Sequence, residues 1–225
     1  MSYALIEYPD REMLAMDLAD QLAGELRMQL DSAERVAFAV PGGTSPGPVF
    51  DALSGVQLDW DRVDVMLTDE RWVPESSPRS NTALLRSRLL VDRAASARLL
   101  PLYRDDVDAD TAVAALSQAI APALPLGVVL LGMGTDCHTA SLFPGADRLA
   151  DALAPDAPVL VPMRAPGAPE PRITLSAPAL DGALSKHVLI FGEDKRAALE
   201  SAQGKAVEDA PINAILSGAK VHWAA

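Results

Sequence analysis

Two hydrophobic patterns alternate along this chain. Unbroken apolar runs predict strands buried on both faces, as in a parallel sheet, whereas apolar residues three or four positions apart predict helices. Strands are predicted in this way at 4–8, 36–40, 63–67, 99–102, 128–131, 186–191 and 221–223, and another is expected over 172–176. Helices are predicted at 10–30, 81–90, 108–121, 193–203 and 211–216. This alternation predicts an α/β fold, a Rossmann-like three-layer sandwich whose mostly parallel central sheet carries helices on both faces.

Local signals refine two of these helices and describe one further segment. Asp10 and Asn81 are the expected N-caps of the helices that they open. The first helix carries an apolar stripe that is expected to face the core: Met13, Leu14, Leu18, Leu22, Leu26 and Leu30. Residues 147–168 are rich in Pro, Ala and Asp, so we expect an irregular surface excursion, long enough to hold a mobile segment over a site.

Composition narrows the class of protein. An apolar fraction of 49% and a length of 225 residues suit a single globular domain over 1–225. No apolar run approaches the roughly 20 residues of a membrane span, and no signal peptide opens the chain. The single cysteine cannot form an intrachain disulfide, which agrees with a reducing compartment. We therefore expect a cytoplasmic protein without membrane contact, as a monomer or a weak homodimer.

The net charge of −12 argues against a nucleic-acid surface, which requires a basic face. It also means that an anionic substrate must be held by a few local cations, because the overall field of the protein repels it.

Polar residues gather directly after three predicted strands. Gly42, Gly43, Thr44 and Ser45 follow the strand at 36–40, Asp69 to Arg71 follow 63–67, and Asp136 and His138 follow 128–131. Arg172 begins a strand, and Lys195 lies in the first turn of a helix, where the dipole disfavours a cation. The carboxyl ends of parallel strands meet at one edge of a sheet, so we expect these groups to converge.

The converging groups suit attack of water on an activated acyl carbon of a phosphorylated substrate. A neutral imidazole of His138 can take a proton from water, and Asp136 can fix its tautomer. Main-chain N–H groups of Gly42 and Gly43 can hold the oxyanion. The sequence has no convincing Ser–His–Asp arrangement, dinucleotide fingerprint or Cys/His set with metal-ligand spacing, so we expect neither a cofactor nor a metal. His187 and His222 lie in or beside strands and are expected to be structural.

Several of these segments resemble the 6-phosphogluconolactonases. Leu131–Gly145 follows their motif LGxGxDGHTASLFPG, except that Cys137 replaces a glycine. Their DERxVP motif and following Ser-Asn pair match residues 69–74 and 80–81, and their RIT motif matches 172–174. Their SGGSTP loop corresponds to residues 41–46, with the two hydroxyl residues exchanged. An asparagine that often follows RIT is absent here, where Asp181 lies nearby.

The resemblance implies hydrolysis of 6-phospho-D-glucono-1,5-lactone to 6-phospho-D-gluconate in the oxidative pentose phosphate pathway. Catalysis would then fall to His138, Asp136, Asp69 and Arg71. In the related sugar-phosphate deaminases, an arginine, a lysine and hydroxyls of the glycine loop bind the phosphate. That similarity assigns the phosphate to Arg172, Lys195 and Thr44 or Ser45, beside the Gly42-Gly43 loop. Arg71 is expected near the reacting centre or paired with Asp69.

Two other functions remain open at this stage. A glucosamine-6-phosphate deaminase or isomerase would use Asp69 to move a proton between carbons, and a non-catalytic sugar-phosphate sensor would keep the pocket without turnover. Cys137 is a separate question: if the family glycine has a positive φ, a cysteine there costs roughly 1–2 kcal/mol. We expect no catalytic role for its thiol.

Overall fold

The computed structural model describes residues 2–225 of the chain. Its central sheet has seven parallel strands in the order β1-β10-β9-β6-β2-β3-β5. The strands are β1 (Ala4–Glu7), β2 (Val36–Val40), β3 (Val63–Leu67), β5 (Arg98–Leu99), β6 (Val128–Gly132), β9 (Ser185–Phe191) and β10 (Lys220–Ala224). Every residue of β2 and β3 is buried, because the strands are covered on both faces. The expected mostly parallel sheet with helices around it is confirmed.

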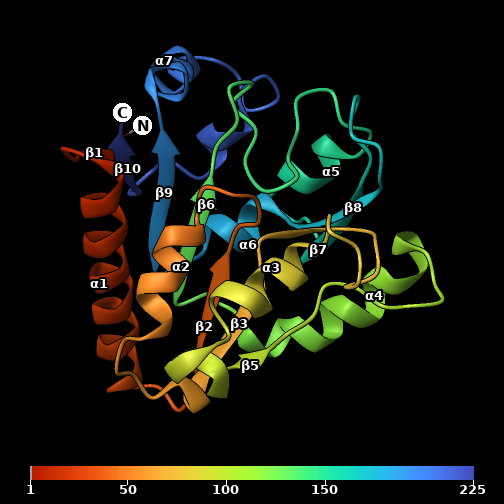
Figure 1. The fold of residues 1–225 in the computed structure, drawn as a ribbon. Helices are drawn as coiled ribbons and strands as arrows, with labels where there is room; N and C mark the ends of the chain where they lie inside the picture. Colours follow the sequence, from red (N-terminus) through yellow and green to blue (C-terminus); the bar gives the residue numbers. More distant parts are fainter. Residues whose placement is uncertain (1) are drawn as a thin grey trace.

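Helices form layers on the two faces of this sheet. They are α1 (Arg11–Leu30), α2 (Gly47–Ser54), α3 (Asn81–Arg88), α4 (Ala109–Ile120), α5 (Leu149–Leu153), α6 (Ala177–Asp181) and α7 (Glu193–Ala202). Four 3₁₀ segments join them: η1 (Trp60–Arg62), η2 (Asp92–Ser96), η3 (Ala121–Ala123) and η4 (Pro211–Ala214). Helix α1 packs against α2, and α2 against α3, so these three share one face (Figure 1). After β5 the strands β6, β9 and β10 follow in the opposite direction across the sheet, so the rule of right-handed crossovers assigns α4 and α7 to the other face.

A second, smaller sheet accompanies α4. It is antiparallel, in the order β4 (Asp69–Arg71), β8 (Arg172–Leu175), β7 (Leu160–Met163), and α4 packs against β7 and β8. Thr68 alone separates β3 from β4: its N–H donates to Val40 of the large sheet, and its carbonyl accepts from Leu175 of the small one. The chain therefore passes from one sheet to the other in a single residue.

This small sheet corrects two expectations. Residues 147–168 are not an irregular excursion, because they contain α5 and the buried strand β7. Arg172 begins a strand as expected, but that strand is antiparallel and belongs to the small sheet, so Arg172 does not follow a parallel strand.

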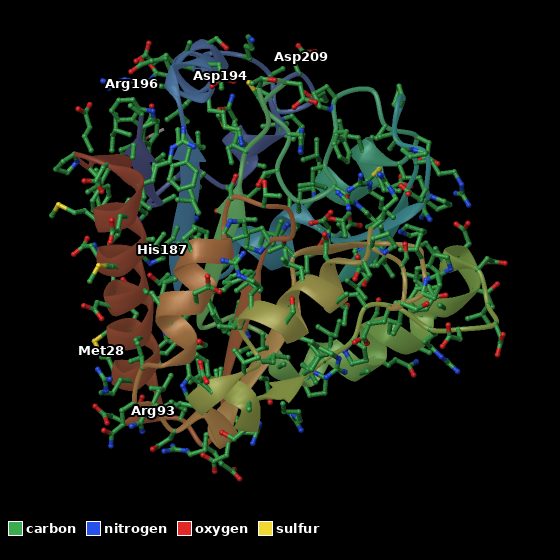
Figure 2. The ribbon with its side chains drawn as sticks, viewed as in Figure 1. Met28, Arg93, His187, Asp194, Arg196 and Asp209 are labelled. Atoms are coloured by element: carbon green, nitrogen blue, oxygen red, sulfur yellow. The ribbon has the colours of Figure 1, made fainter. Side chains whose placement is uncertain are left out.

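Local details of the helices also differ from expectation. Asp10 caps α1 as predicted, accepting from the N–H of Met13, but the Met13 side chain is exposed and does not join the core stripe. Ser80, not Asn81, is the N-cap of α3, and that helix ends at Arg88. Helix α1, with Met28 on its outer side, is long, but none of the helices within residues 2–225 is long and apolar enough to cross a membrane (Figure 2).

The two termini of the described chain lie side by side at one edge of the large sheet (Figure 1). There β1 pairs with β10, and the carboxyl ends of the strands point toward α7.

Candidate active site

A cavity of about 210 Å³ lies where the carboxyl ends of β2 and β6 meet. These strands are neighbours, but the chain proceeds from β2 to β3 on one side and from β6 to β9 on the other. The order of the strands therefore reverses between β2 and β6. Ligands of open α/β sheets bind at such a switch point. We call this cavity the pocket. Its lining residues are Pro41, Gly42, Gly43, Ser45, Pro46, Asp69, Arg71, Asn81, Gly132, Met133, Gly134, His138, Ala140, Arg172, Leu189 and Lys195.

The loop after β6 brings an acid and a histidine together. It turns tightly, because the N–H of Cys137 donates to the carbonyl of Gly134, and the N–H of Gly134 donates to the carbonyl of His138. The Oδ1 of Asp136 lies 2.5 Å from Nδ1 of His138 and also accepts from its main-chain N–H. No residue in the described part of the chain hydrogen-bonds Nε2 of His138, and the imidazole lines the pocket. One ring nitrogen is thus held by the acid, and the other is available.

Charge at this loop follows from that contact. Burial alone would raise the pKa of Asp136, but the attraction of His138 and hydrogen bonds from its ring and main chain outweigh burial. The net pKa of Asp136 therefore lies below its usual value, and the carboxylate stays ionised beside the imidazole.

Two residues of the turn have special backbone requirements. A Cβ on Gly134 would overlap the ring of His138 and the carboxylate of Asp136, so only glycine lets the pair approach the main chain here. Cys137 has a φ of 65°, in the left-handed region, so the condition under which a cysteine is strained at this position is met. Its buried thiol donates to the carbonyl of Ala198 on α7 and does not line the pocket. The thiol is therefore not placed to act as a nucleophile.

The glycine loop between β2 and α2 forms a second wall. Gly42, Gly43 and Ser45 line the pocket, whereas Thr44 is exposed and does not, so the structure brings in only one of the two hydroxyl residues. The N–H groups of Gly42 and Gly43 donate to no residue within 2–225. A Cβ on Gly42 would overlap the amide of Asn81, which explains why glycine is required at this point.

The small sheet supplies a carboxylate and two guanidinium groups. Asp69 and Arg71 alternate with Glu70 on β4 and both line the pocket, and Arg71 pairs with Arg172 across the strands. Asp69 is buried, accepts from the hydroxyl of Ser141 at 2.5 Å, and lies 3.6 Å from Nη1 of Arg172. Asp69 is thus occupied by an arginine and a hydroxyl of the same molecule.

The cations of the pocket are incompletely paired. The Nε atoms of Arg71 and Arg172 are buried and lack a hydrogen-bond partner within residues 2–225. Burial lowers the pKa of Arg172, and the carboxylate of Asp69 only partly offsets this. Lys195, in the first turn of α7, also lines the pocket. Three cations against one buried carboxylate make this a local anion-binding environment within an acidic chain.

Sequence reasoning located most of the pocket. Eight of the predicted residues line it: Gly42, Gly43, Ser45, Asp69, Arg71, His138, Arg172 and Lys195. Asp136 does not line it but holds the ring of His138. Two further residues were not predicted: Asn81, assigned to capping, lines the pocket, and Phe143 packs against two of the lining residues. The Phe143 ring contacts both His138, at 4.3 Å between centroids, and Arg172, at 5.3 Å from its guanidinium. Phe143 lies within the recognised motif, but residue spacing alone does not predict a contact between an aromatic ring and these two side chains.

A metal centre is not indicated by the side chains present. Within residues 2–225, no group of three or more His, Cys, Asp or Glu residues is arranged to hold a metal ion.

Comparisons with known proteins agree with the resemblance in the motifs. The family model described as glucosamine-6-phosphate isomerases/6-phosphogluconolactonase matches residues 9–223. A 6-phosphogluconolactonase of Mesorhizobium japonicum is 42% identical, with 99% of this chain and 96% of the relative covered. One of Rhizobium meliloti is 40% identical, with both chains fully covered.

Solved structures give the same result. The crystal structure of a 6-phosphogluconolactonase from Shewanella baltica superposes with a TM-score of 0.96 at 31% identity, covering 100% of this chain and 98% of the other. That of a putative 6-phosphogluconolactonase from Neisseria gonorrhoeae gives 0.90 at 35% identity, covering 99% and 98%. With its sequence matched almost end to end and its fold superposed throughout, this chain belongs to the glucosamine-6-phosphate isomerase/6-phosphogluconolactonase family.

Proposed function

We propose that this chain is a 6-phosphogluconolactonase, which hydrolyses 6-phospho-D-glucono-1,5-lactone to 6-phospho-D-gluconate in the oxidative pentose phosphate pathway. One observation carries the proposal: an imidazole held by a carboxylate on one nitrogen offers the other to a pocket with three cations. The names of the relatives, all 6-phosphogluconolactonases, support the same substrate.

His138 acts as the general base in this proposal. Its Nε2 takes a proton from water as the water oxygen attacks the lactone carbonyl carbon. Asp136 keeps the proton of the neutral ring on Nδ1 and stabilises the imidazolium that forms. When the bond between the carbonyl carbon and the ring oxygen breaks, His138 returns a proton to that oxygen. A strained lactone requires no covalent intermediate, which agrees with a pocket that Cys137 does not line.

The negative charge that develops on the carbonyl oxygen needs donors. The N–H groups of Gly42 and Gly43 have no partner among the described residues and lie in the wall of the pocket. They are the proposed oxyanion donors, and Arg71 supplies positive charge nearby. Removing one such donor typically costs about 2.7–4 kcal/mol of transition-state stabilisation.

The phosphate is assigned to the other cations. Arg172 can grip it through two parallel hydrogen bonds, and Lys195 acts as a point charge. Ser45 adds a hydroxyl from the glycine loop. Thr44, which sequence reasoning left as an equal candidate, is exposed and outside the pocket wall, so Ser45 is preferred.

Two assays test this function. Lactone disappearance is measured against the uncatalysed background for the wild type and for His138→Ala, and glucosamine-6-phosphate is offered as a second substrate. We expect lactone turnover by the wild type, a rate lower by about 10²–10⁴-fold in His138→Ala, and no turnover of glucosamine-6-phosphate by either. Binding of 6-phosphogluconate by His138→Ala should be retained. Wild-type turnover in the variant would remove the mechanism. Turnover of glucosamine-6-phosphate in place of the lactone would favour the deaminase, and product binding without any turnover would favour the sensor.

A further inference from the structure

Glu70 is a buried carboxylate that the proposed mechanism does not use. It lies between Asp69 and Arg71 on β4, and because strand side chains alternate, it points away from the pocket that its two neighbours line. Its exposed fraction is 0%, and no Lys, Arg or His of residues 2–225 forms an ion pair with it. Ionised carboxylates without a cation are rare in protein interiors, because desolvation costs several kcal/mol. A specific set of donors must therefore hold this one.

Those donors come from the start of α3 and from β4 itself. Oε1 accepts from the main-chain N–H groups of Arg71, at 2.7 Å, and Asn81, at 2.9 Å. Oε2 accepts from the N–H of Thr82 at 2.7 Å, from its hydroxyl at 2.8 Å, and from the hydroxyl of Ser80 at 3.2 Å. The N–H groups at a helix start have no partner within the helix, and the dipole there favours an anion. Glu70 thus ties the first turn of α3 to β4.

This tie determines where two pocket residues lie. Arg71 is held through its own main-chain N–H, and Asn81 through the N–H at the first position of α3. The Asn81 amide in turn donates to the main-chain carbonyl of Asp69 and packs against Gly42 of the glycine loop. A shift of α3 relative to β4 would therefore move the walls of the pocket on both sides of the proposed reacting centre.

We infer that Glu70 is a positioning residue, which acts through Arg71 and Asn81 without touching the substrate. The inference rests on the proposed lactonase function and assigns part of the rate to a side chain on the far face of β4. It predicts that loss of Glu70 lowers kcat but not the affinity for the phosphorylated product. Because Arg172, Lys195 and Ser45 are not held by Glu70, its loss acts on the reacting end and leaves the grip on phosphate intact.

The main test substitutes Glu70→Gln in the full chain. The amide nitrogen of glutamine has to face either the N–H groups of Arg71 and Asn81 or the donors of Thr82 and Ser80, so one set of hydrogen bonds is lost. A misplacement of about 1 Å can cost about 10²-fold in rate. We expect kcat to fall by about 10- to 100-fold, with the Kd for 6-phosphogluconate within about threefold of the wild type.

Asp64→Asn is the matched control. Asp64 is also a buried carboxylate, held by Arg35 and Arg98, but it lies at the start of β3, at the opposite end of the sheet from the pocket. It should lower the Tm while leaving kcat of the folded fraction near the wild-type value. Thr82→Val removes one donor to Glu70 with little change in shape, and we expect a smaller loss of kcat in the same direction.

The outcomes separate cleanly. If Glu70→Gln does not fold, Thr82→Val decides. A wild-type kcat in folded Glu70→Gln would overturn this inference and leave the proposed function standing; where Thr82→Val decides, a wild-type kcat in that variant has the same meaning. A loss of kcat in Asp64→Asn as large as in Glu70→Gln, with the same fall in Tm, would also overturn it. Absence of lactone turnover in the wild type would overturn the proposed function and this inference with it.

Discussion

Two acid–histidine pairs of the same chemistry occur in this molecule with opposite surroundings. In the pocket, Asp136 and His138 lie 2.5 Å apart, and their side chains are 54% and 31% exposed. Between α1 and β9, Glu25 and His187 lie 2.7 Å apart, at 16% and 0% (Figure 2). The two pairs differ in the ring nitrogen that does not bond the acid. No described residue bonds Nε2 of His138, whereas Nδ1 of His187 bonds the ring of His222 at 2.9 Å. An imidazole serves as a base only where one nitrogen remains available beside a cavity.

The buried pair belongs to a longer chain of hydrogen bonds. His222 continues it to the hydroxyl of Tyr8, and Tyr8 to Asp17. Four hydrogen bonds thus link Glu25 to Asp17 through two imidazoles and a phenol. These bonds connect α1 to β9 and β10, as expected of structural histidines, and both imidazoles have a partner on each ring nitrogen.

The largest effect is expected from removing the histidine of each pair in turn. His138→Ala is expected to lower kcat by about 10²–10⁴-fold with little change in stability, because a general base is lost at a partly exposed site. His187→Ala should leave kcat of the folded enzyme unchanged and lower the free energy of unfolding by about 1–3 kcal/mol, because buried partners lose their hydrogen bonds. Steady-state kinetics and urea unfolding check both. A rate loss in His187→Ala as large as in His138→Ala would end the comparison.

Next in size is the effect of crowding the pocket pair. Gly134→Ala places a methyl group against His138 and Asp136, so the imidazole must move, and kcat should fall by about 10- to 100-fold. Gly24→Ala, on α1 with no atom near its added methyl group, is the control, and it should leave kcat unchanged and slightly raise the Tm. Equal kinetics in the two variants would show that the position of His138 does not limit the rate.

Acid should weaken the buried chain in a defined window. Burial lowers the pKa of His222 from 6.5 to about 3, so the folded state keeps it neutral while the unfolded state takes up a proton. Burial opposes ionisation of Glu25, but hydrogen bonds from His187, Lys220 and Ser185 outweigh it and lower that pKa from 4.5 to about 2. Both shifts have the same sign: stability is full at neutral pH and is lost as the pH falls.

Between pH 6.5 and 4.5 the contribution of His222 is larger than that of Glu25. The free energy of unfolding should fall there by up to about 1.4 kcal/mol per pH unit because of His222. Below pH 4.5 Glu25 adds to it. Urea unfolding from pH 7 to pH 4 measures the slope. His222→Phe should flatten it and His138→Ala should not, and an unchanged slope in His222→Phe would contradict the assignment.

The smallest effect is expected at Cys137. Cys137→Gly relieves the positive φ but loses a buried thiol and adds flexibility to the unfolded chain, so the free energy of unfolding should change by less than about 1 kcal/mol. Activity should be retained or improved. Complete loss of turnover, measured at full folding by circular dichroism, would show that the thiol has a role.

The parallel sheet could be predicted because its strands are unbroken apolar runs, and the loops of the pocket because their motifs follow those strands. The small sheet could not. Pro162 and the surrounding Pro, Ala and Asp residues obscure β7, and proline is tolerated there because β7 is an edge strand. Asn81 was misassigned because Ser80 and Asn81 can both cap a helix. Glu70 looked like one of three loop charges until its burial was known.

Thr68 gives this arrangement a consequence for assembly. His138 and the glycine loop extend from the seven-stranded sheet, whereas Asp69, Arg71 and Arg172 belong to the three-stranded one. Thr68 is the shortest of the segments through which the chain crosses between the two sheets. Neither half contains a complete set of groups. A chain whose seven strands had formed before the other three docked would show most of its final secondary structure and no turnover, so the appearance of activity during refolding marks the moment of docking.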